Sequence, residues 1–236
     1  MYDYRKQLWL NPDIDYIFNA DIVEYDMTDA GFSLIQEFHL LPDYQIDALA
    51  RIKKGMVRHI EIGKLQRNNQ LFSTQLNDKF AEMRLVFIDM NGLSDDDILT
   101  VKKDAIFTLK RCDRIEFGKV KFRPKNKYSS YVRFPSINNM ELFYNGEIEM
   151  KGMSNLCLNR HRLYMQTFLQ KIIEMIEEKD SRTKRWLMKF ISDYKFRELE
   201  DPYYLEFNNR SDTFNPMFNY INVILPFVQI VQKEIP

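Results

Sequence analysis

VEYDMTDAGFSLI, residues 23–35, joins an alternating apolar pattern to an apolar run and carries two carboxylates, Asp26 and Asp29. The alternation predicts a strand that delivers Asp26 at its end, and the following residues as far as Pro42 predict a short helix. An unpaired charge inside a protein is so costly that it usually acquires a partner or a metal ion. The function of this segment therefore depends on what lies beside Asp26.

Three further elements are expected in the first half of the chain. Residues 43–70 carry apolar side chains at helical spacing and predict one or two helices with a basic surface. Residues 73–91 predict a longer helix that stops at an Asn-Gly pair. Residues 96–110 contain two β-rich runs around two lysines and Asp104, which predicts a tight hairpin, or one kinked strand, with Asp104 near its apex.

The second half begins with strands and ends with helices. Residues 113–152 predict antiparallel strands with turns at Asn126 and at an Asn-Gly pair, residues 145–146. Residues 159–199 predict amphipathic helices. The order of elements predicts an α+β fold, with a mostly antiparallel sheet covered by helices on one face.

We expect two domains from this order of elements. The first covers residues 1–155 and includes a small helical insertion at about residues 43–70, and the second is a helical lobe over residues 156–236. No internal repeat or low-complexity segment interrupts them.

Composition narrows the classes of function. The chain has 236 residues, of which 45% are hydrophobic, so it can bury one large core or two smaller ones. Its 34 basic and 34 acidic residues cancel, so contact with nucleic acid requires a local basic patch. Two distant cysteines suggest neither a disulfide framework nor a zinc site. No apolar run is long enough to cross a bilayer, so we expect an intracellular, cytoplasmic protein without a membrane partner.

Asp26 and Asp104 are the candidate metal ligands. If their strands are neighbours in one sheet, both carboxylates leave the same edge and could hold a pair of divalent cations for phosphoryl transfer. Oxygen ligands without histidine or cysteine favour Mg²⁺ or Mn²⁺ over zinc. Alternatively, each aspartate could cap a turn or pair with a nearby lysine.

Several motifs, taken in chain order, resemble those of the family B DNA polymerases. Residues 26–35, DMTDAGFSLI, resemble the first palm motif, Asp-x-x-Ser-Leu-Tyr-Pro-Ser-Ile-Ile, and residues 98–107, ILTVKKDAIF, resemble the Tyr-Gly-Asp-Thr-Asp-Ser-Ile-Phe hairpin. Residues 125–131, KNKYSSY, and residues 147–153, EIEMKGM, resemble the Lys-Lys-x-Tyr and lysine-glycine elements. The similarity spans roughly residues 20–155, and each motif is degenerate.

The resemblance implies a palm-like sheet with a finger insertion, a thumb-like C-terminal lobe and a template-directed nucleotidyltransferase activity. It assigns catalysis and metal binding to Asp26 and Asp104. Primer, template and nucleoside triphosphates would be its ligands, with protein subunits as further partners. The residues expected to bind nucleic acid are Lys125, Lys127 and Tyr128, and those expected to meet the incoming nucleotide are Gly31, Lys53, Lys54 and Arg58.

The chain departs from the family pattern at three points. Lys102 and Lys103 replace an acid and a threonine of the hairpin, which removes one carboxylate from the site. Gly31 aligns with the tyrosine that excludes a ribose 2′-hydroxyl, so ribonucleotides are expected to be tolerated. The finger motif Lys-x-x-x-Asn-Ser-x-Tyr-Gly is missing, and the basic residues of the 43–70 insertion are its substitutes. A degenerate palm that binds nucleic acid or a larger replication or transcription complex without catalysis is the alternative.

Structural roles could explain the same residues. Asp29 fits the N-cap of the following helix, and Gly31 could serve close packing. Lys53, Lys54 and Arg58 could form a solvated helix face, and the lysines near Tyr128 could protect an edge strand. The acidic run at residues 94–98 fits a solvated turn better than a metal cluster.

Overall fold

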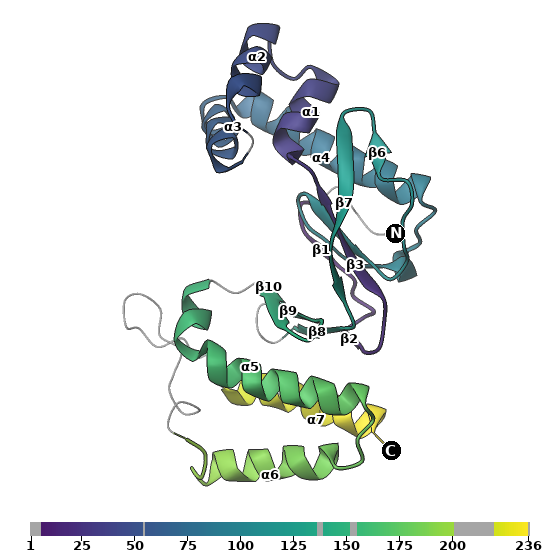
Figure 1. Ribbon diagram of the computed structural model, residues 1–236, viewed down its shortest axis with the longest axis vertical. Coiled ribbons are helices and arrows are strands. Elements are labelled where there is room, and N and C mark those ends of the chain that lie inside the picture. Colours follow the sequence, from purple (N-terminus) through teal and green to yellow (C-terminus); the bar gives the residue numbers. More distant parts are fainter. Residues whose placement is uncertain (1–5, 54, 136–138, 152–154, 201–219, 236) are drawn as a thin grey trace. The chain divides into compact units, whose positions relative to one another are not determined.

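The computed structural model describes residues 6–53, 55–135, 139–151, 155–200 and 220–235, which form two compact units (Figure 1). The first unit contains residues 1–13 and 21–127, and the second contains residues 14–20 and 128–236. The sequence placed the division near residue 155 instead. The difference arises because the strands after residue 128 share a core with the C-terminal helices.

The first unit contains a six-stranded sheet in the order β1-β4-β5-β3-β7-β6. Its strands are β1 (Trp9–Leu10), β3 (Ile22–Met27), β4 (Ile98–Val101), β5 (Ala105–Thr108), β6 (Glu116–Phe117) and β7 (Val120–Tyr128). Its helices are α1 (Ala30–Phe38), α2 (Asp43–Arg51), α3 (Met56–Asn68) and α4 (Gln70–Met90), and a 3-10 turn, η1 (Asp95–Asp97), precedes β4.

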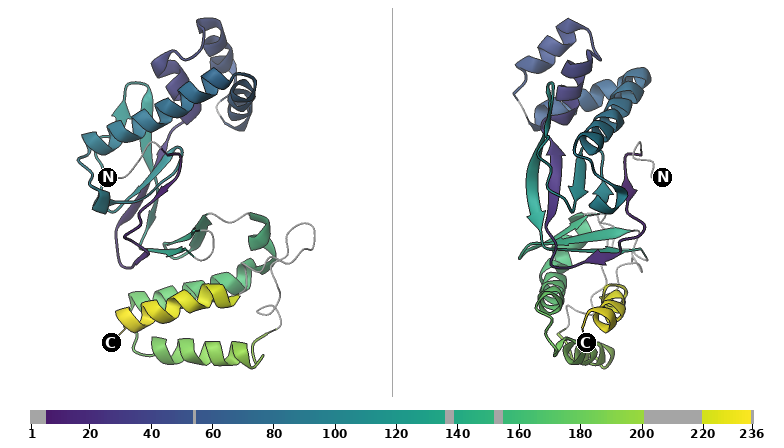
Figure 2. Two further views of the ribbon diagram at one scale, coloured as in Figure 1. Left: turned by 180° about the vertical axis from the view of Figure 1, so that it is seen from behind. Right: turned by 90° about the vertical axis from the view of Figure 1, so that its right-hand side faces the viewer.

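The alternation of apolar and acidic side chains along β3 shows which face of this sheet is covered by the core. Val23, Tyr25 and Met27 belong to the hydrophobic core of the unit, so the side chains of Glu24 and Asp26 lie on the opposite face. Helix α4 supplies apolar side chains to the same core and extends along the core face of the sheet, as Figure 2 illustrates. These α4 residues are Phe72, Leu76, Phe80, Met83, Phe87 and Ile88.

The second unit contains a four-stranded sheet in the order β10-β9-β8-β2. Its strands are β2 (Tyr16–Ile17), β8 (Ser130–Phe134), β9 (Met140–Tyr144) and β10 (Ile148–Lys151), and its helices are α5 (Asn155–Glu177), α6 (Thr183–Lys195) and α7 (Tyr220–Glu234). Side chains of β8 and β9 pack with those of all three helices in a single core.

The α+β class predicted from the sequence is confirmed, as are the helix after Asp29 and the tight hairpin at Asp104. Two local predictions are wrong. Strand β7 continues through Asn126 instead of turning there, and α4 begins three residues before Ser73 because the Asn69 side chain caps it. Within the described ranges, no helix has the combination of length and apolarity needed to cross a membrane.

Candidate metal and nucleic-acid site

Asp26 occupies the penultimate position of β3, on the face opposite the core. Its register partner on β5 is Ala105, and the next residue, Met27, donates its N–H to the carbonyl oxygen of Asp104 at 2.8 Å. Asp104 therefore lies opposite Met27, the residue after Asp26, and its charge acts on Asp26. The strand of Asp26 and the hairpin of Asp104 are neighbours in one sheet, as the metal-site prediction required, and a shared site for the two carboxylates stays a prediction.

The hairpin that carries Asp104 is tight and is held by hydrogen bonds from helix α4. Lys102 and Ala105 exchange both backbone hydrogen bonds, which leaves Lys103 and Asp104 as the two turn residues. Arg84 of α4 is fully buried and donates to the carbonyl oxygen of Lys103 at 2.7 Å and to that of Lys6 at 3.0 Å. These bonds fix the turn against α4, so the position of Asp104 is determined by the core.

Lys103 does not extend toward the acids. Its ammonium group lies 4.9 Å from the centre of the Phe80 ring on α4, a cation–π contact. The substitution of a lysine at this turn position therefore adds a packing contact on the helix side of the hairpin.

Strand β7 lies on the other side of β3 and supplies basic side chains. Thr28 donates its N–H to the carbonyl oxygen of Lys121, Arg123 lies 3.7 Å from Asp26, and Lys125 lies 3.3 Å from Glu24. The residue numbers of these partners fall along β3 as they rise along β7, so the two strands are antiparallel. Lys121 and Arg123 alternate with the buried Val120 and Phe122, and Lys125 follows at the same spacing, so the three share the face that carries Asp26.

Glu24 links the acidic and basic strands. Its side chain is almost completely buried, and it accepts hydrogen bonds from Lys125 Nζ and, at 2.7 Å, from Asn126 Nδ2. A buried carboxylate requires such donors to compensate for lost hydration. Glu24 therefore holds the far part of β7 against β3, two residues before the candidate ligand.

The surroundings of Asp26 oppose its ionisation. Burial raises the pKa of the Asp26 carboxyl, and the negative charge of Asp104 raises it further, whereas Lys125 and Arg123 lower it and Glu24 raises it. Two carboxylates that repel each other are stabilised in the charged form by a cation between them. The pair therefore has the donor chemistry and the electrostatics that suit a divalent metal ion.

The number of carboxylates limits what this site can hold without a substrate. Across the described ranges, three or more Asp, Glu, His or Cys side chains do not gather into a group suited to a metal ion. Mg²⁺ is commonly bound by one or two carboxylates together with waters and substrate phosphates. Asp26 and Asp104 fit that second pattern and not a closed protein cage.

The residues predicted to meet the nucleotide lie on or near α1 and α3. Gly31 is buried in α1, and a side-chain carbon at that position would lie 3.4 Å from Ile62 of α3. That is an ordinary van der Waals distance, so packing against Ile62 does not by itself require a glycine at this position. Lys53 is exposed, and Lys54 lies outside the described residues.

Arg58 is a buried structural link. It forms an ion pair with Asp29 at 2.5 Å, donates to the carbonyl oxygens of Ala50 and Ile52, and stacks over the Phe32 ring at 4.3 Å. These contacts join α1, α2 and α3. Phosphate contact by Arg58 remains a prediction, and it would require some of these bonds to break.

Asp29 occupies the predicted N-cap position of α1 but does not cap it through its side chain. Its backbone is left-handed, with φ of 50°, and its side chain pairs with Arg58 instead. The first turn of α1 is stabilised in another way, since Ser33 donates its side-chain hydroxyl to the carbonyl oxygen of Thr28.

The three predicted nucleic-acid ligands have different surroundings. Lys125 and Lys127 are exposed on β7. Tyr128 is buried, belongs to the second unit, and donates its hydroxyl to Glu149. The lysines are accessible to a phosphate backbone, whereas Tyr128 would have to leave its partner to stack on a base.

Sequence reasoning missed Glu24 and Arg84. Glu24 could have been found, because it lies two residues before Asp26 and therefore on the same face of the strand. Arg84 follows Leu76 and Phe80 at the spacing of the buried stripe of α4, where a charged residue is unusual and indicates a buried partner.

The two units together define an α+β protein with Asp26 and a basic strand on one face of its larger sheet and Asp104 in the adjoining hairpin turn. The chain matches the family model described as Bacteriophage PBS1 gene 130 protein over residues 1–225, and it belongs to that family of phage proteins. None of the curated proteins compared with the chain matches it.

Proposed function

We propose that this chain is a metal-dependent nucleotidyltransferase of the template-directed polymerase type. In this proposal the first unit is a palm-like sheet, α2 and α3 form a finger-like insertion, and α5, α6 and α7 form a thumb-like lobe. The observation that carries the proposal is the adjacency of Asp26 and Asp104 beside the basic strand β7.

The acidic pair would act as the cation-binding centre. Asp26 and Asp104 would bind Mg²⁺ or Mn²⁺ through carboxylate oxygens, with the triphosphate of the nucleotide completing the coordination. A bound cation would neutralise the charge that develops on the reacting phosphate oxygens. Asp26 would contribute a carboxylate that is fixed by β3, and Asp104 one that is fixed by Arg84 through the hairpin backbone.

The basic strand would hold nucleic acid. Arg123, Lys125 and Lys127 are exposed on a single strand, and Arg123 and Lys125 share the face of Asp26 and Glu24. Such side chains bind phosphates without reading the bases. A primer strand along β7 would bring its end toward Asp26, because Arg123 and Asp26 are neighbours.

The sugar preference of the proposed enzyme follows from α1. Gly31 has no side chain that could exclude a ribose 2′-hydroxyl, and Ile62 is the nearest side chain to that position. We therefore include ribonucleotide incorporation in the proposal and test it together with deoxyribonucleotide incorporation.

A second candidate function is nucleic-acid binding without catalysis. Its support is the replacement of one hairpin acid by Lys102 and the approach of Arg123 to Asp26, which gives that carboxylate a cationic neighbour within the protein. In this alternative the basic residues of β7 still bind a nucleic-acid strand, and Asp26 serves only to position Arg123.

Primer extension separates these candidates. Labelled deoxy- and ribonucleotides are supplied with a primed template in Mg²⁺ or Mn²⁺, using the wild-type chain and the variants Asp26→Asn and Asp104→Asn. The proposal predicts product from the wild type and a loss of at least about a hundredfold in each variant, as expected for removal of a metal ligand. Asp113→Asn is the matched control, since Asp113 is in the same unit, is 90% exposed and has Arg111 as its basic neighbour.

The variants are accepted only if their thermal unfolding resembles that of the wild type. Undiminished product in folded Asp26→Asn or Asp104→Asn would remove the enzyme assignment. Primer–template binding without product in any metal would support the second candidate.

A further inference from the structure

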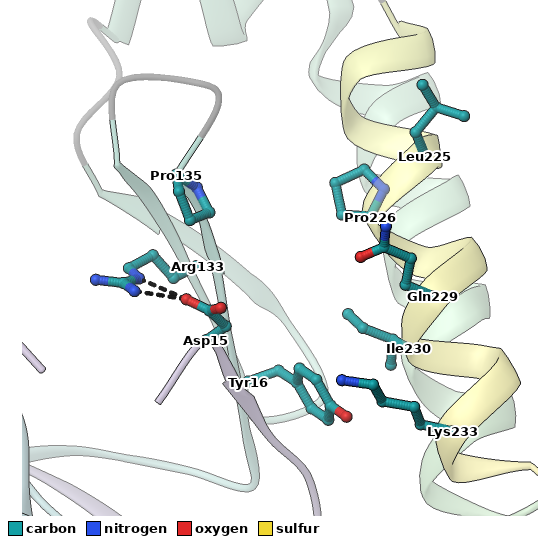
Figure 3. Close-up of a pocket in the computed structure, with 9 residues that line it drawn as sticks. All are labelled: Asp15, Tyr16, Arg133, Pro135, Leu225, Pro226, Gln229, Ile230 and Lys233. Carbon is teal, nitrogen blue, oxygen red and sulfur yellow. Dashed lines mark hydrogen bonds and ion pairs between the residues drawn. The ribbon is translucent and has the colours of Figure 1, made fainter. Parts of the chain in front are cut away.

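A groove in the second unit runs between strand β2 and helix α7. Figure 3 shows Asp15, Tyr16, Arg133 and Pro135 on the strand side, facing residues of α7 that extend from Leu225 to Lys233. The cavity has a volume of about 480 Å³, which lies within the range of ligand-binding pockets.

A second cavity continues the first past Tyr16. It has a volume of about 300 Å³ and is lined by Tyr16, Ile17, Phe18 and Asn19 of the chain around β2, and by Ile176, Lys179 and Glu234. Because Tyr16 lines both cavities, the two adjoin at β2, and we take them together as the groove. A groove of this form suits an extended chain better than a compact small molecule.

Strand β2 is the last described strand at its edge of the sheet. Arg133 donates its N–H to the carbonyl oxygen of Asp15, and Ile17 is paired with Tyr131, so the odd-numbered residues of this segment bond to β8. In an antiparallel pair the intervening residue directs its N–H and C=O the other way. The backbone of Tyr16 is therefore directed away from β8, as needed to pair with an added strand.

The charged side chains that line the two cavities carry a small net positive charge, because Asp15 and Arg133 cancel and the two lysines outnumber Glu234. Asp15 accepts two hydrogen bonds from Arg133, with Nη2 at 2.5 Å and Nε at 3.0 Å, and Glu234 accepts one from the Tyr16 hydroxyl. Lys179 and Lys233 are exposed, and among the described residues neither has an acidic partner. Figure 3 shows Lys233 extending from α7 toward the ring of Tyr16.

The opposite end of the groove is apolar. Leu225 is 52% exposed at this end, next to Pro226 and across from Pro135. Pro226 lies inside α7 and contributes a flat ring without an N–H group. The groove thus offers an apolar surface at one end and ammonium groups at the other.

We propose that this groove binds an extended, acidic segment of a partner protein, which adds to β2 as a strand. An apolar side chain of the segment packs against Leu225 and Pro226, and its carboxylates pair with Lys233 and Lys179. Strand addition of this kind takes affinity from main-chain hydrogen bonds and specificity from side-chain pockets. This inference concerns the second unit alone and does not depend on the polymerase proposal.

Peptide binding is the direct test. The probes are fluorescein-labelled octapeptides with one fixed leucine and two fixed aspartates, their other positions randomised, compared with the same set carrying lysine in place of aspartate. Fluorescence polarisation with the full chain is expected to select members of the acidic set only. N-methylation of the backbone at alternate residues of a selected peptide should abolish binding, because it removes the donors that pair with β2.

Matched variants locate the binding. Lys179→Glu and Lys233→Glu should each weaken a selected peptide by about tenfold or more, as expected for reversal of a charge pair at an interface. Lys184→Glu, an exposed lysine on α6 that lines neither cavity, should leave binding unchanged. Leu225→Ser should weaken binding without a change in thermal stability, since Leu225 is half exposed.

Three results would overturn the proposal. One is the absence of any preference for the acidic peptides over the lysine set. Another is binding that survives both Lys233→Glu and backbone methylation. The third is evidence that something else binds in the groove. Such evidence would be concentration-dependent dimerisation that Leu225→Ser abolishes. It would also be oligonucleotide binding that the two lysine variants abolish, while acidic peptides fail to bind.

Discussion

Asp26 and Asp104 meet across the β3–β5 pair, where the residue after Asp26 bonds to the backbone of Asp104 and the charge of Asp104 raises the pKa of the Asp26 carboxyl. Repulsion between the two carboxylates makes their ionisation unfavourable in the folded protein. A structural role for the pair would be better served by a neutral side chain at one of the positions. This cost is the main reason to propose that a cation binds between them.

Replacement of Glu24 by alanine should loosen the basic strand. The change removes the buried acceptor of Lys125 and Asn126, and loss of a buried hydrogen-bonded partner costs about 1–3 kcal/mol of unfolding free energy. Primer–template affinity should also fall, because Lys125 loses its fixed position. Urea unfolding and fluorescence anisotropy with a primed duplex measure the two effects.

Glu24→Gln is the control for that experiment. Glutamine retains an oxygen that can accept from Asn126 but lacks the charge that holds Lys125, so its effect on stability should be smaller. If Glu24→Ala unfolds like the wild type and binds the duplex equally well, Glu24 has no part in positioning β7.

The Asp29–Arg58 pair should couple α1 to the helices of the insertion. Both side chains are about nine-tenths buried, and Arg58→Ala leaves Asp29 without its partner, which costs about 3–5 kcal/mol in such pairs. Asp29→Asn should cost less, since asparagine tolerates the left-handed backbone at that position. In the double variant the combined loss should be smaller than the sum of the two.

An exposed pair on the same helix provides the comparison. Lys64 and Glu61 are 2.6 Å apart but well exposed, so Lys64→Ala should cost less than about 1 kcal/mol in urea unfolding. Equal losses for Arg58→Ala and Lys64→Ala would show that the buried pair contributes nothing special to the insertion.

Gly118 is expected to accept a side chain only if the Glu37 carboxylate moves away. It has φ of 61° at the β6–β7 turn, and an added carbon would lie 2.4 Å from the Glu37 carboxylate, which accepts the N–H of Lys119 at 2.7 Å. Gly92 has a similar φ of 57° but open space around it. Gly118→Ala should therefore destabilise the protein by clearly more than Gly92→Ala, for which backbone strain of about 1 kcal/mol is expected. Thermal unfolding that ranks the two variants equally would contradict this account of Glu37.

Asp97 should make the stability depend on pH in the acidic range. Hydrogen bonds from the backbone and the hydroxyl of Ser94 hold the pKa of the Asp97 carboxyl below its usual range. A lowered pKa in the folded protein gives stability that is present above the unfolded pKa, about 3.9, and is lost as the pH falls through the folded value.

Asp97→Ala should thus be less stable than the wild type at neutral pH, with a difference that narrows on acidification. Asp96→Ala, in the same turn but exposed, should give a much smaller difference at every pH. A constant gap between Asp97→Ala and the wild type across the acidic range would rule out the Ser94 hydrogen bonds as its cause.

The sequence predicted the elements whose signals are local. Three such signals are the alternation in β3, the helical spacing in α4 and the paired lysines before Asp104. Each lies within one segment, so it can be recognised without knowledge of the tertiary structure. The pairing of β3 with the hairpin that carries Asp104 could be anticipated because a strand and a hairpin of one antiparallel sheet tend to be neighbours.

Other features depend on contacts between distant segments. Arg58 was expected on a basic surface but forms a buried ion pair instead. Its partners Asp29, Ala50 and Ile52 come together around it only when three helices pack. The boundary at residue 128 likewise depends on which core the strands β8 and β9 join. Propensity along the chain carries no information about that choice.

Manganese binding tests the central claim most directly, because it requires neither a template nor catalysis. Mn²⁺ is titrated into the wild-type chain, Asp26→Asn, Asp104→Asn and the double variant, and free metal is followed by electron paramagnetic resonance. A shared site predicts binding by the wild type, a loss of about tenfold or more in each single variant, and little further loss in the double variant. Equal Mn²⁺ affinity in all four folded proteins would show that the two carboxylates do not share a cation, and it would contradict the account.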